Sequence, residues 1–240
     1  MNTKTVRELL FEGYDDPLLD FLRELKIPTI NIPFSKFGWF AERNESSTYD
    51  GTFNMFTGEH DITKLGVMSL WNGNNRTDFY RDQCGVISGT TGELWPPVNG
   101  KPDISLFVTD FCRPIKLSYK SDFSSMGIDG GKWVGDERVF DNGRNYEPNS
   151  CYCTADVAEC PDLPSGVQNV SQCKFGAPAF ISFPHFYLAD PTYLNNIEGM
   201  HPNAEEHEFY VSMEPRTGIP LRVRAALQLN LLLQPVERLE

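Results

Sequence analysis

The feature that most constrains this sequence is the position of its six cysteines, which all fall between residues 84 and 173. An even number of cysteines in one short stretch is typical of a disulfide framework, and disulfides persist in an oxidising compartment. A structural zinc site is the alternative, but Cys151 and Cys153 are separated by one residue and no second close pair follows at ligand spacing. The pattern favours disulfides among Cys84, Cys112, Cys151, Cys153, Cys160 and Cys173.

Export from the cytoplasm is also indicated by the sequons for N-linked glycosylation. Their asparagines are Asn44, Asn75 and Asn169, each followed two residues later by Ser or Thr. Yet the first residues lack the apolar core of a signal peptide, and no apolar run approaches the roughly 20 residues that span a bilayer. We therefore expect this chain to be part of a longer exported protein.

Composition and charge exclude some classes of function. The sequence carries 33 Asp and Glu against 21 Lys and Arg, a net charge of −12. That sign is wrong for binding the phosphate backbone of a nucleic acid, so we expect no nucleic-acid partner. Hydrophobic residues make up 40% of the chain, which is enough for a globular core.

Two short helices are predicted near the start of the chain. Thr5 and Glu8 match a capping box, in which each side chain accepts a hydrogen bond from an otherwise unpaired amide, and Gly13 ends the first helix. Asp16 and Pro17 then offer an N-cap and a preset first helical residue. Apolar residues follow at helical spacing as far as Pro28, at Leu18, Leu22 and Leu25.

From there the apolar period changes to two, as in β-strands. Residues 51–58 alternate between two glycines, and Phe209, Val211 and Met213 share one face of another strand. Across residues 221–233 every odd position is apolar, which predicts one long strand with one buried face. Turn-forming clusters between such stretches suit antiparallel connections, so the residues favour a mostly β fold, a twisted antiparallel sheet or barrel.

Motif spacing does not support a catalytic or metal site. His201 and His207 are six residues apart with Pro202 between them, whereas a zincin helix needs two histidines four apart. These histidines and His185 suit hydrogen-bonding roles better than metal ligation. There is no Gly-x-Ser-x-Gly elbow, and pairing of the cysteines removes a nucleophilic thiolate. We expect no enzyme activity, no metal and no cofactor.

A secreted glycosidase or esterase is the competing class of function. The neighbouring carboxylates Glu205 and Glu206 could suggest it, but adjacent residues on a strand point apart. The aromatic clusters leave a second alternative open, since such clusters usually fill a core but can also line a cavity for an apolar ligand in a barrel. They are Phe34, Phe37, Trp39 and Phe40, and Phe180, Phe183, Phe186 and Tyr187.

Several short motifs occur in the order and spacing found in one family. They are Gly13-Tyr14-Asp15-Asp16-Pro17, Asp82-Gln83-Cys84 with Ile87-Ser88-Gly89-Thr90, Trp95-Pro96-Pro97, Thr109-Asp110-Phe111-Cys112-Arg113, Cys151-Tyr152-Cys153, Ser182-Phe183-Pro184-His185-Phe186 and His201-Pro202-Asn203-Ala204-Glu205-Glu206-His207. On these motifs the chain closely resembles the class B scavenger receptors, which include fatty acid translocase, scavenger receptor class B type I and lysosomal integral membrane protein two. Phe37-Gly38-Trp39-Phe40 looks most like the insect members.

This resemblance implies that the chain is an incomplete ectodomain. Family members have a transmembrane helix near each end of a large glycosylated extracellular or lumenal part, and this chain would be the later portion of that part. The implied fold is mostly β with a few helices: an antiparallel β-barrel, stapled by disulfides, with short helices at its apex. Residues 1–28 would form the apical amphipathic helices. Residues 29–240 would form the barrel, including the cysteine-rich segment 84–173.

The resemblance also implies how the cysteines pair. Carried over position by position, the family pattern joins Cys84 to Cys151, Cys112 to Cys173 and Cys153 to Cys160, one of the fifteen pairings that six cysteines permit. The first bond closes a long loop and would stabilise the fold by roughly 4 kcal/mol in the chain-entropy account. The last bond only shapes a tight loop.

Proteins similar to this one bind lipoproteins, fatty acids or other lipid-bearing ligands and pass lipid through a hydrophobic tunnel toward the membrane. An apolar conduit spares a lipid the cost of crossing water, about 0.8 kcal/mol per CH2 group. The resemblance thus implies a lipid receptor on the extracellular side of the plasma membrane, or on the lumenal side of an endosomal or lysosomal membrane. The alternative within the family is a trafficking receptor for a protein cargo. Residues 221–233 suit a tunnel wall or a filled barrel face equally, and the sequence identifies no ligand contact.

Overall fold

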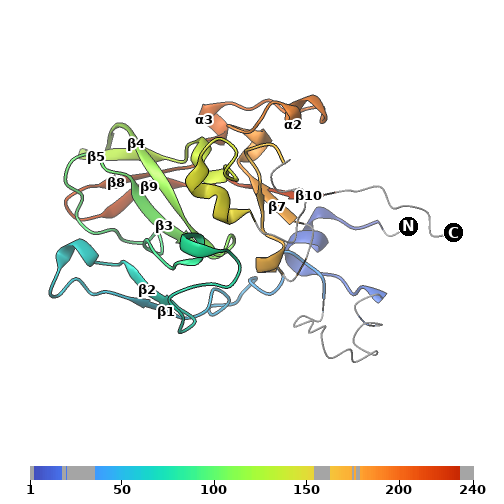
Figure 1. Cartoon of the computed structure of the whole chain (residues 1–240), viewed down its shortest axis with the longest axis horizontal. Helices are drawn as coiled ribbons and strands as arrows, with labels where there is room; N and C mark the ends of the chain where they lie inside the picture. Colours follow the sequence, from blue (N-terminus) through green and yellow to red (C-terminus); the bar gives the residue numbers. More distant parts are fainter. Residues whose placement is uncertain are drawn as a thin grey trace. The chain divides into compact units, whose positions relative to one another are not determined.

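The computed structural model describes residues 3–17, 20, 36–153, 163–174, 176 and 179–232. The chain divides into two compact units, Met1–Thr52 and Phe53–Glu240. In the described part, the strands β1 to β10 all belong to the second unit, and Figure 1 labels all of them except β6.

The first unit contains the predicted capping box. The Thr5 amide donates to Glu8 Oε2 at 2.8 Å, and the Glu8 amide donates to Thr5 Oγ1 at 3.1 Å. The short π-helix η1 (Glu8–Glu12) follows, and Gly13 ends it with a φ of 68°. The first predicted helix is therefore confirmed. The apolar positions of the second predicted helix, Leu18, Leu22 and Leu25, lie outside the described residues.

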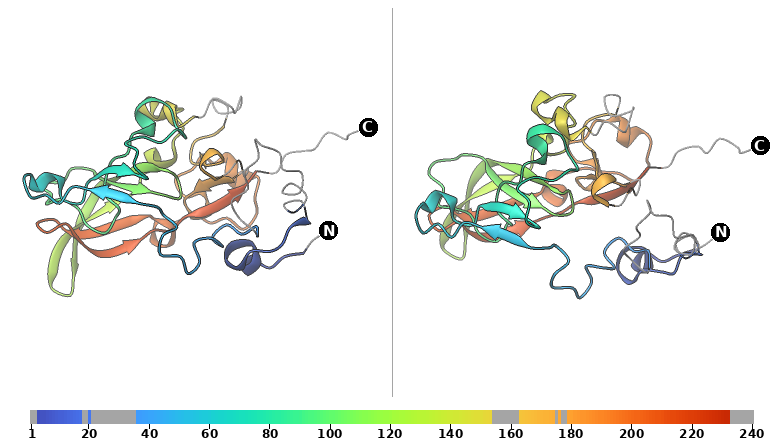
Figure 2. Two further views of the ribbon diagram at one scale, coloured as in Figure 1. Left: turned by 90° about the horizontal axis from the view of Figure 1, so that it is seen from below. Right: turned by 60° about the horizontal axis from the view of Figure 1, so that its bottom comes forward.

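The second unit is built on a five-stranded antiparallel sheet in the order β3-β4-β5-β8-β9. The strands are β3 (Ile104–Val108), β4 (Arg113–Ser125), β5 (Ile128–Val134), β8 (Tyr210–Glu214) and β9 (Ile219–Arg224). β4 and β5 form a long hairpin that extends beyond the other strands (Figure 2). Its turn residues Met126 and Gly127 both have positive φ, as in the type I′ turns whose twist matches that of paired strands.

Two smaller antiparallel sheets and several short helices surround this sheet. The smaller sheets pair β1 (Phe53–Met55) with β2 (Met68–Trp71), and place β10 (Gln228–Leu231), β7 (Ala179–Ser182) and β6 (Gln168–Asn169) in that order. The helices are η2 (Ile62–Lys64), η3 (Asp82–Gly85), η4 (Glu137–Phe140), η5 (Glu147–Tyr152), η6 (Gln172–Lys174), η7 (Pro184–Phe186), α2 (Thr192–Asn195) and α3 (Ala204–His207). The fold class is confirmed as mostly β, antiparallel, with few helices.

The core lies against the middle of the five-stranded sheet. Phe209, Val211 and Met213 have exposed fractions of 2%, 1% and 0%, which confirms the predicted buried face of β8. Ser212 on the other face is also fully buried, so β8 is covered on both sides. Trp133 of β5 pairs with Val211 in register and donates its indole N–H to the Pro102 carbonyl at 2.8 Å. A buried indole needs such a partner, because leaving its N–H unpaired is costly.

The prediction of one long strand over residues 221–233 is wrong. β9 ends at Arg224 and β10 begins at Gln228, and the two strands belong to different sheets. Nor do the odd positions share a buried face, because Val223 is 50% exposed and Leu231 is 61% exposed. The sequence period of two continues through the break, while the pairing partner of the chain changes from β8 to β7.

Candidate functional site

Two disulfides hold the cysteine-rich segment together. Cys84 in η3 is bonded to Cys151 in η5, and Cys112, just before β4, is bonded to Cys173 in η6. These are two of the pairs that the resemblance implies. Three of these cysteines pack with Tyr80 in one buried cluster. The third implied pair includes Cys160, which lies outside the described residues, so the Cys153–Cys160 bond stays a prediction.

A cleft of about 490 Å³ opens beside the first disulfide. Arg138 lines this cleft and binds Asp136 Oδ2 at 2.6 Å and Asp103 Oδ2 at 3.5 Å. Burial would raise the pKa of Asp136, but hydrogen bonds from Arg138 and Ser118 outweigh burial and hold that pKa below its ordinary value. Asp136 is therefore a charged hydrogen-bond acceptor at neutral pH and is unsuited to act there as a general acid.

Arg113 supplies a second positive charge beside this cleft. Its side chain is buried, and its guanidinium lies 3.9 Å from the centre of the Tyr152 ring. Its Nη atoms donate to the carbonyls of Val139 and Pro114, while its buried Nε has no hydrogen-bond partner among the described residues. Neutral carbonyls and a ring face compensate a guanidinium charge less fully than a carboxylate does. The cleft can therefore accommodate an anionic group better than a cation.

The Trp95-Pro96-Pro97 motif lines a second hollow of about 350 Å³. The Trp95 indole N–H donates to the Ser105 carbonyl at 3.1 Å, and the Trp95 amide donates to the Gly218 carbonyl at 3.0 Å. Gly218 has a φ of 71°, and a Cβ there would lie only 1.7 Å from the Trp95 carbonyl oxygen. The motif thus fastens the loop before β3 to the turn between β8 and β9.

Exposed apolar side chains occur along β9 and at the end of β10, and we call this set of residues the apolar stripe. Its exposed members are Ile219, Val223, Leu231 and Leu232, with exposed fractions of 52%, 50%, 61% and 38%. β9 carries a bulge at Leu221, so Ile219 pairs with Glu214 whereas Val223 pairs with Val211, and the two side chains point to opposite faces of the sheet. The stripe includes the stretch expected as a tunnel wall or a filled barrel face. These side chains are partly exposed in the described part of the chain, and the tunnel wall and the filled face both stay predictions.

The structure brings two of the predicted histidines together. The rings of His185 and His207 stack with 4.4 Å between their centres and 16° between their planes. His201 contributes its backbone amide to His185 Nδ1 rather than its ring. The described residues contain no group of three or more metal-ligating side chains. Sequence analysis did not find the stack, because its members are 22 residues apart and follow no period.

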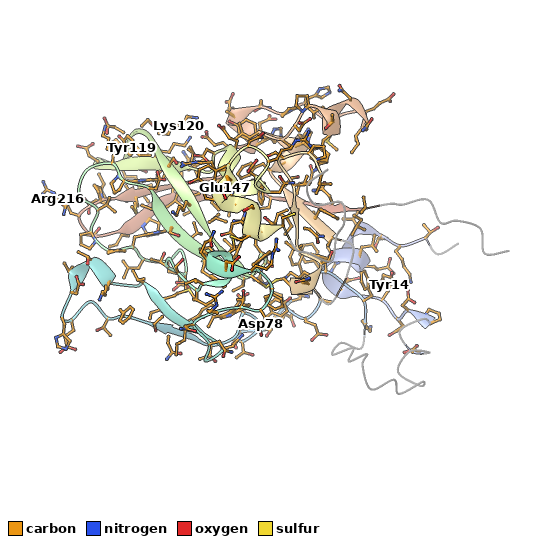
Figure 3. All side chains as sticks on the ribbon, viewed as in Figure 1. Tyr14, Asp78, Tyr119, Lys120, Glu147 and Arg216 are labelled. Carbon is orange, nitrogen blue, oxygen red and sulfur yellow. A yellow bond between two sulfur atoms is a disulfide. The ribbon has the colours of Figure 1, made fainter. Side chains whose placement is uncertain are left out.

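A buried carboxylate beside α3 was also missed. Glu208 is 3% exposed and binds both Lys120 of β4 and Lys132 of β5, the latter at 2.6 Å. Burial would raise the pKa of Glu208, but the hydrogen bonds from the two lysines outweigh it and lower that pKa. Figure 3 shows Lys120 beside Tyr119 on β4. Because Glu208 binds two lysines, we interpret these three side chains as a structural ion cluster rather than as an acid–base site.

The sequon asparagines differ in exposure. Asn44 and Asn75 are exposed, which suits attachment of a glycan. Asn169 in β6 is partly buried, and its Oδ1 accepts a hydrogen bond from the Ser171 amide at 2.9 Å. Glycosylation at all three asparagines stays a prediction. No helix among the described residues has both the length and the apolar character needed to cross a bilayer.

The sequence matches the CD36 family across residues 1–240. Protein peste of Drosophila melanogaster is 39% identical over 235 residues, which cover 98% of this chain and 41% of that protein. Scavenger receptor class B member 1 of Sus scrofa is 38% identical over 237 residues, covering 98% and 44%. Lysosome membrane protein 2 of Homo sapiens is 36% identical over 237 residues, covering 98% and 47%.

The chain thus spans less than half the length of these relatives. The family match covers the range that contains the stapled segment, the sheet and the histidine stack. The resemblance found from the motifs is therefore confirmed, and this chain belongs to the CD36 family.

Proposed function

We propose that this chain is part of the ectodomain of a class B scavenger receptor, which binds lipoproteins, fatty acids or other lipid-bearing ligands and passes lipid toward the membrane. The observation that carries the proposal is the apolar stripe of β9 and β10. Its side chains are half exposed although each would be more stable away from water, by about 25 cal/mol for every Å² covered. Acyl chains packed against these side chains would supply that cover. No covalent step is needed, so this role requires no enzyme activity and no cofactor.

The similarity to scavenger receptor class B member 1 supports the receptor role, and the similarity to lysosome membrane protein 2 supports a membrane location. We accordingly propose a site of action on the extracellular face of the plasma membrane, or on the lumenal face of an endosomal or lysosomal membrane. Membrane attachment would come from segments outside this chain. The second candidate function, a trafficking receptor for a protein cargo, rests on the similarity to lysosome membrane protein 2.

Mass spectrometry of lipids that co-purify with the full-length ectodomain tests the proposal. The protein should be secreted from eukaryotic cells so that disulfides and glycans form. We expect fatty acid, sterol or phospholipid at near one molecule per protein, and a several-fold loss of bound lipid in the double variant Val223→Asn with Leu231→Asn. Met126→Asn is the matched control, because Met126 is fully exposed at the β4–β5 turn and lies off the stripe.

The outcomes separate the two functions. Equal lipid in the stripe variant and in the wild type would contradict the stripe as the lipid surface. A lipid-free ectodomain that still binds a protein partner would instead support the trafficking receptor.

A further inference from the structure

The stacked histidines join two segments that are distant in the sequence. His185 lies in η7 and His207 closes α3, and their rings overlap at 4.4 Å. His185 has a φ of 53°, in the left-handed region that a residue with a Cβ rarely adopts. Its backbone amide donates to Gln228 Oε1 of β10 at 2.9 Å. The stack is therefore a junction between η7, α3 and β10, held with some backbone strain.

Each ring in the stack accepts a hydrogen bond through the same nitrogen. His185 Nδ1 accepts from the His201 backbone amide at 3.0 Å, and His207 Nδ1 accepts from the Asn203 backbone amide at 3.0 Å. An imidazole nitrogen accepts only when it carries no proton, so both rings must be neutral with hydrogen on Nε2. The loop that leads into α3 is fastened at two points by neutral histidines.

Protonation of the two rings removes the hydrogen bonds to Nδ1 and places like charges in the ring stack. A proton taken from solvent by Nδ1 turns the acceptor into a donor, which then faces the amide hydrogen that it had bound. When both rings are protonated, two positive charges lie in stacked rings whose centres are 4.4 Å apart. His207 is buried, so water screens this repulsion poorly.

The surrounding charges only partly offset the repulsion between the two protonated rings. On α3, Glu206 Oε2 lies 3.9 Å from His207 Nε2 and would attract a charged ring, but the Glu206 side chain is 73% exposed and the attraction is screened. Just after α3, the negative charge of Glu208 is compensated by the positive charges of Lys120 of β4 and Lys132 of β5. Arg224 of β9 binds the Glu205 carbonyl, adding a positive charge near α3. After η7, burial followed by the charge of Glu208 raises the pKa of Tyr187, which stays neutral.

We propose that the His185–His207 stack is an acid-labile clasp that holds residues 200–207 against η7 at neutral pH and releases them at the pH of endosomes and lysosomes. The proposal goes beyond the lipid-receptor function and does not depend on it. Histidine is the side chain whose charge ordinarily changes in this range of pH, between about 5 and 8. The released segment carries the acidic side chains Glu205 and Glu206, so opening changes the surface that the protein presents.

Hydrogen exchange of backbone amides on the full-length polypeptide tests the clasp. Between about pH 7.4 and pH 5, after correction for intrinsic exchange rates, we expect protection of the His201 and Asn203 amides to fall about tenfold or more as their acceptors are lost. The Trp133 amide in the central sheet should keep its protection. Nitrogen chemical shifts of the imidazoles should show Nε2–H tautomers at the higher pH and protonated rings at the lower pH.

Variants separate the clasp from general acid damage. In the double variant His185→Asn with His207→Asn, the amide oxygens can replace the Nδ1 acceptors but cannot be protonated, so we expect the acid response to disappear. His201→Asn is the matched control, because it leaves the donating backbone amide in place, and it should respond like the wild type. An unchanged acid response in the double variant would overturn the proposal. If that variant does not fold, an Nδ1–H tautomer of either ring in the wild type at neutral pH would overturn it independently.

Discussion

β8 and β9 are neighbours in the same sheet and carry the same alternation of apolar residues, yet they differ in burial. Val211 of β8 is 1% exposed, whereas its direct cross-strand partner Val223 of β9 is 50% exposed. Paired residues point to the same face of a sheet, so the layer that covers this face ends between the two strands. Alternation of apolar residues therefore predicts a strand, whereas burial of its side chains depends on the segments that pack over that strand.

The largest expected effect comes from removing a buried side chain of β8. Met213→Ala should lower the free energy of unfolding by about 3 kcal/mol, because Met213 is completely buried and its loss leaves a cavity. Val223→Ala is the matched change in β9 and should stay within about 0.5 kcal/mol. Urea unfolding of both variants measures the difference, and equal losses would mean that β9 is covered in solution.

A smaller effect is expected where β5 and β8 approach closely. A Cβ on Gly130 would lie 2.4 Å from the Met213 carbonyl oxygen, which is backbone and cannot move freely. Gly130→Ala should therefore destabilise the sheet by roughly 1–3 kcal/mol through strain. Asp129→Ala, one residue earlier on the same strand and exposed, is the control. A Gly130→Ala protein as stable as the control would show that β5 and β8 can separate without cost.

The smallest effect concerns the buried carboxylate that follows β8. The pKa of Glu208 is lower when folded than its ordinary value of 4.5. A lowered pKa stabilises the folded state above pH 4.5, and the contribution is lost as the pH falls through the folded pKa. Glu208→Gln should thus flatten the acid limb of the stability curve by about 1 kcal/mol or less, since Lys120 reaches solvent.

Thermal unfolding between about pH 3 and pH 6 measures this slope. Glu147→Gln, an exposed carboxamide variant in η5, should leave the slope as it is in the wild type. An equally steep acid limb in Glu208→Gln would contradict a stabilising role for the ion cluster. This range lies mostly below that of the histidine clasp, so the two acid effects are distinguishable.

Local chemistry made part of this structure predictable. The capping box of Thr5 and Glu8 needs only residues three apart, and the buried face of β8 follows from a period of two. The break between β9 and β10 was not predictable in this way, because it arises from a change of strand partner and leaves the alternation intact. The His185–His207 stack and the Glu208 cluster likewise depend on contacts between distant segments, which no local pattern encodes.

The order of the two disulfides determines whether the chain stays in one piece after proteolytic cleavage. Cys112 lies inside the loop closed by Cys84 and Cys151, while its partner Cys173 lies outside that loop. The two covalent loops therefore overlap, and together they span every peptide bond from residue 84 to residue 173. A single cut anywhere in that stretch leaves the two pieces of the chain covalently joined. Cleavage by a protease within residues 84–173 would therefore separate the two pieces only after the disulfides are reduced.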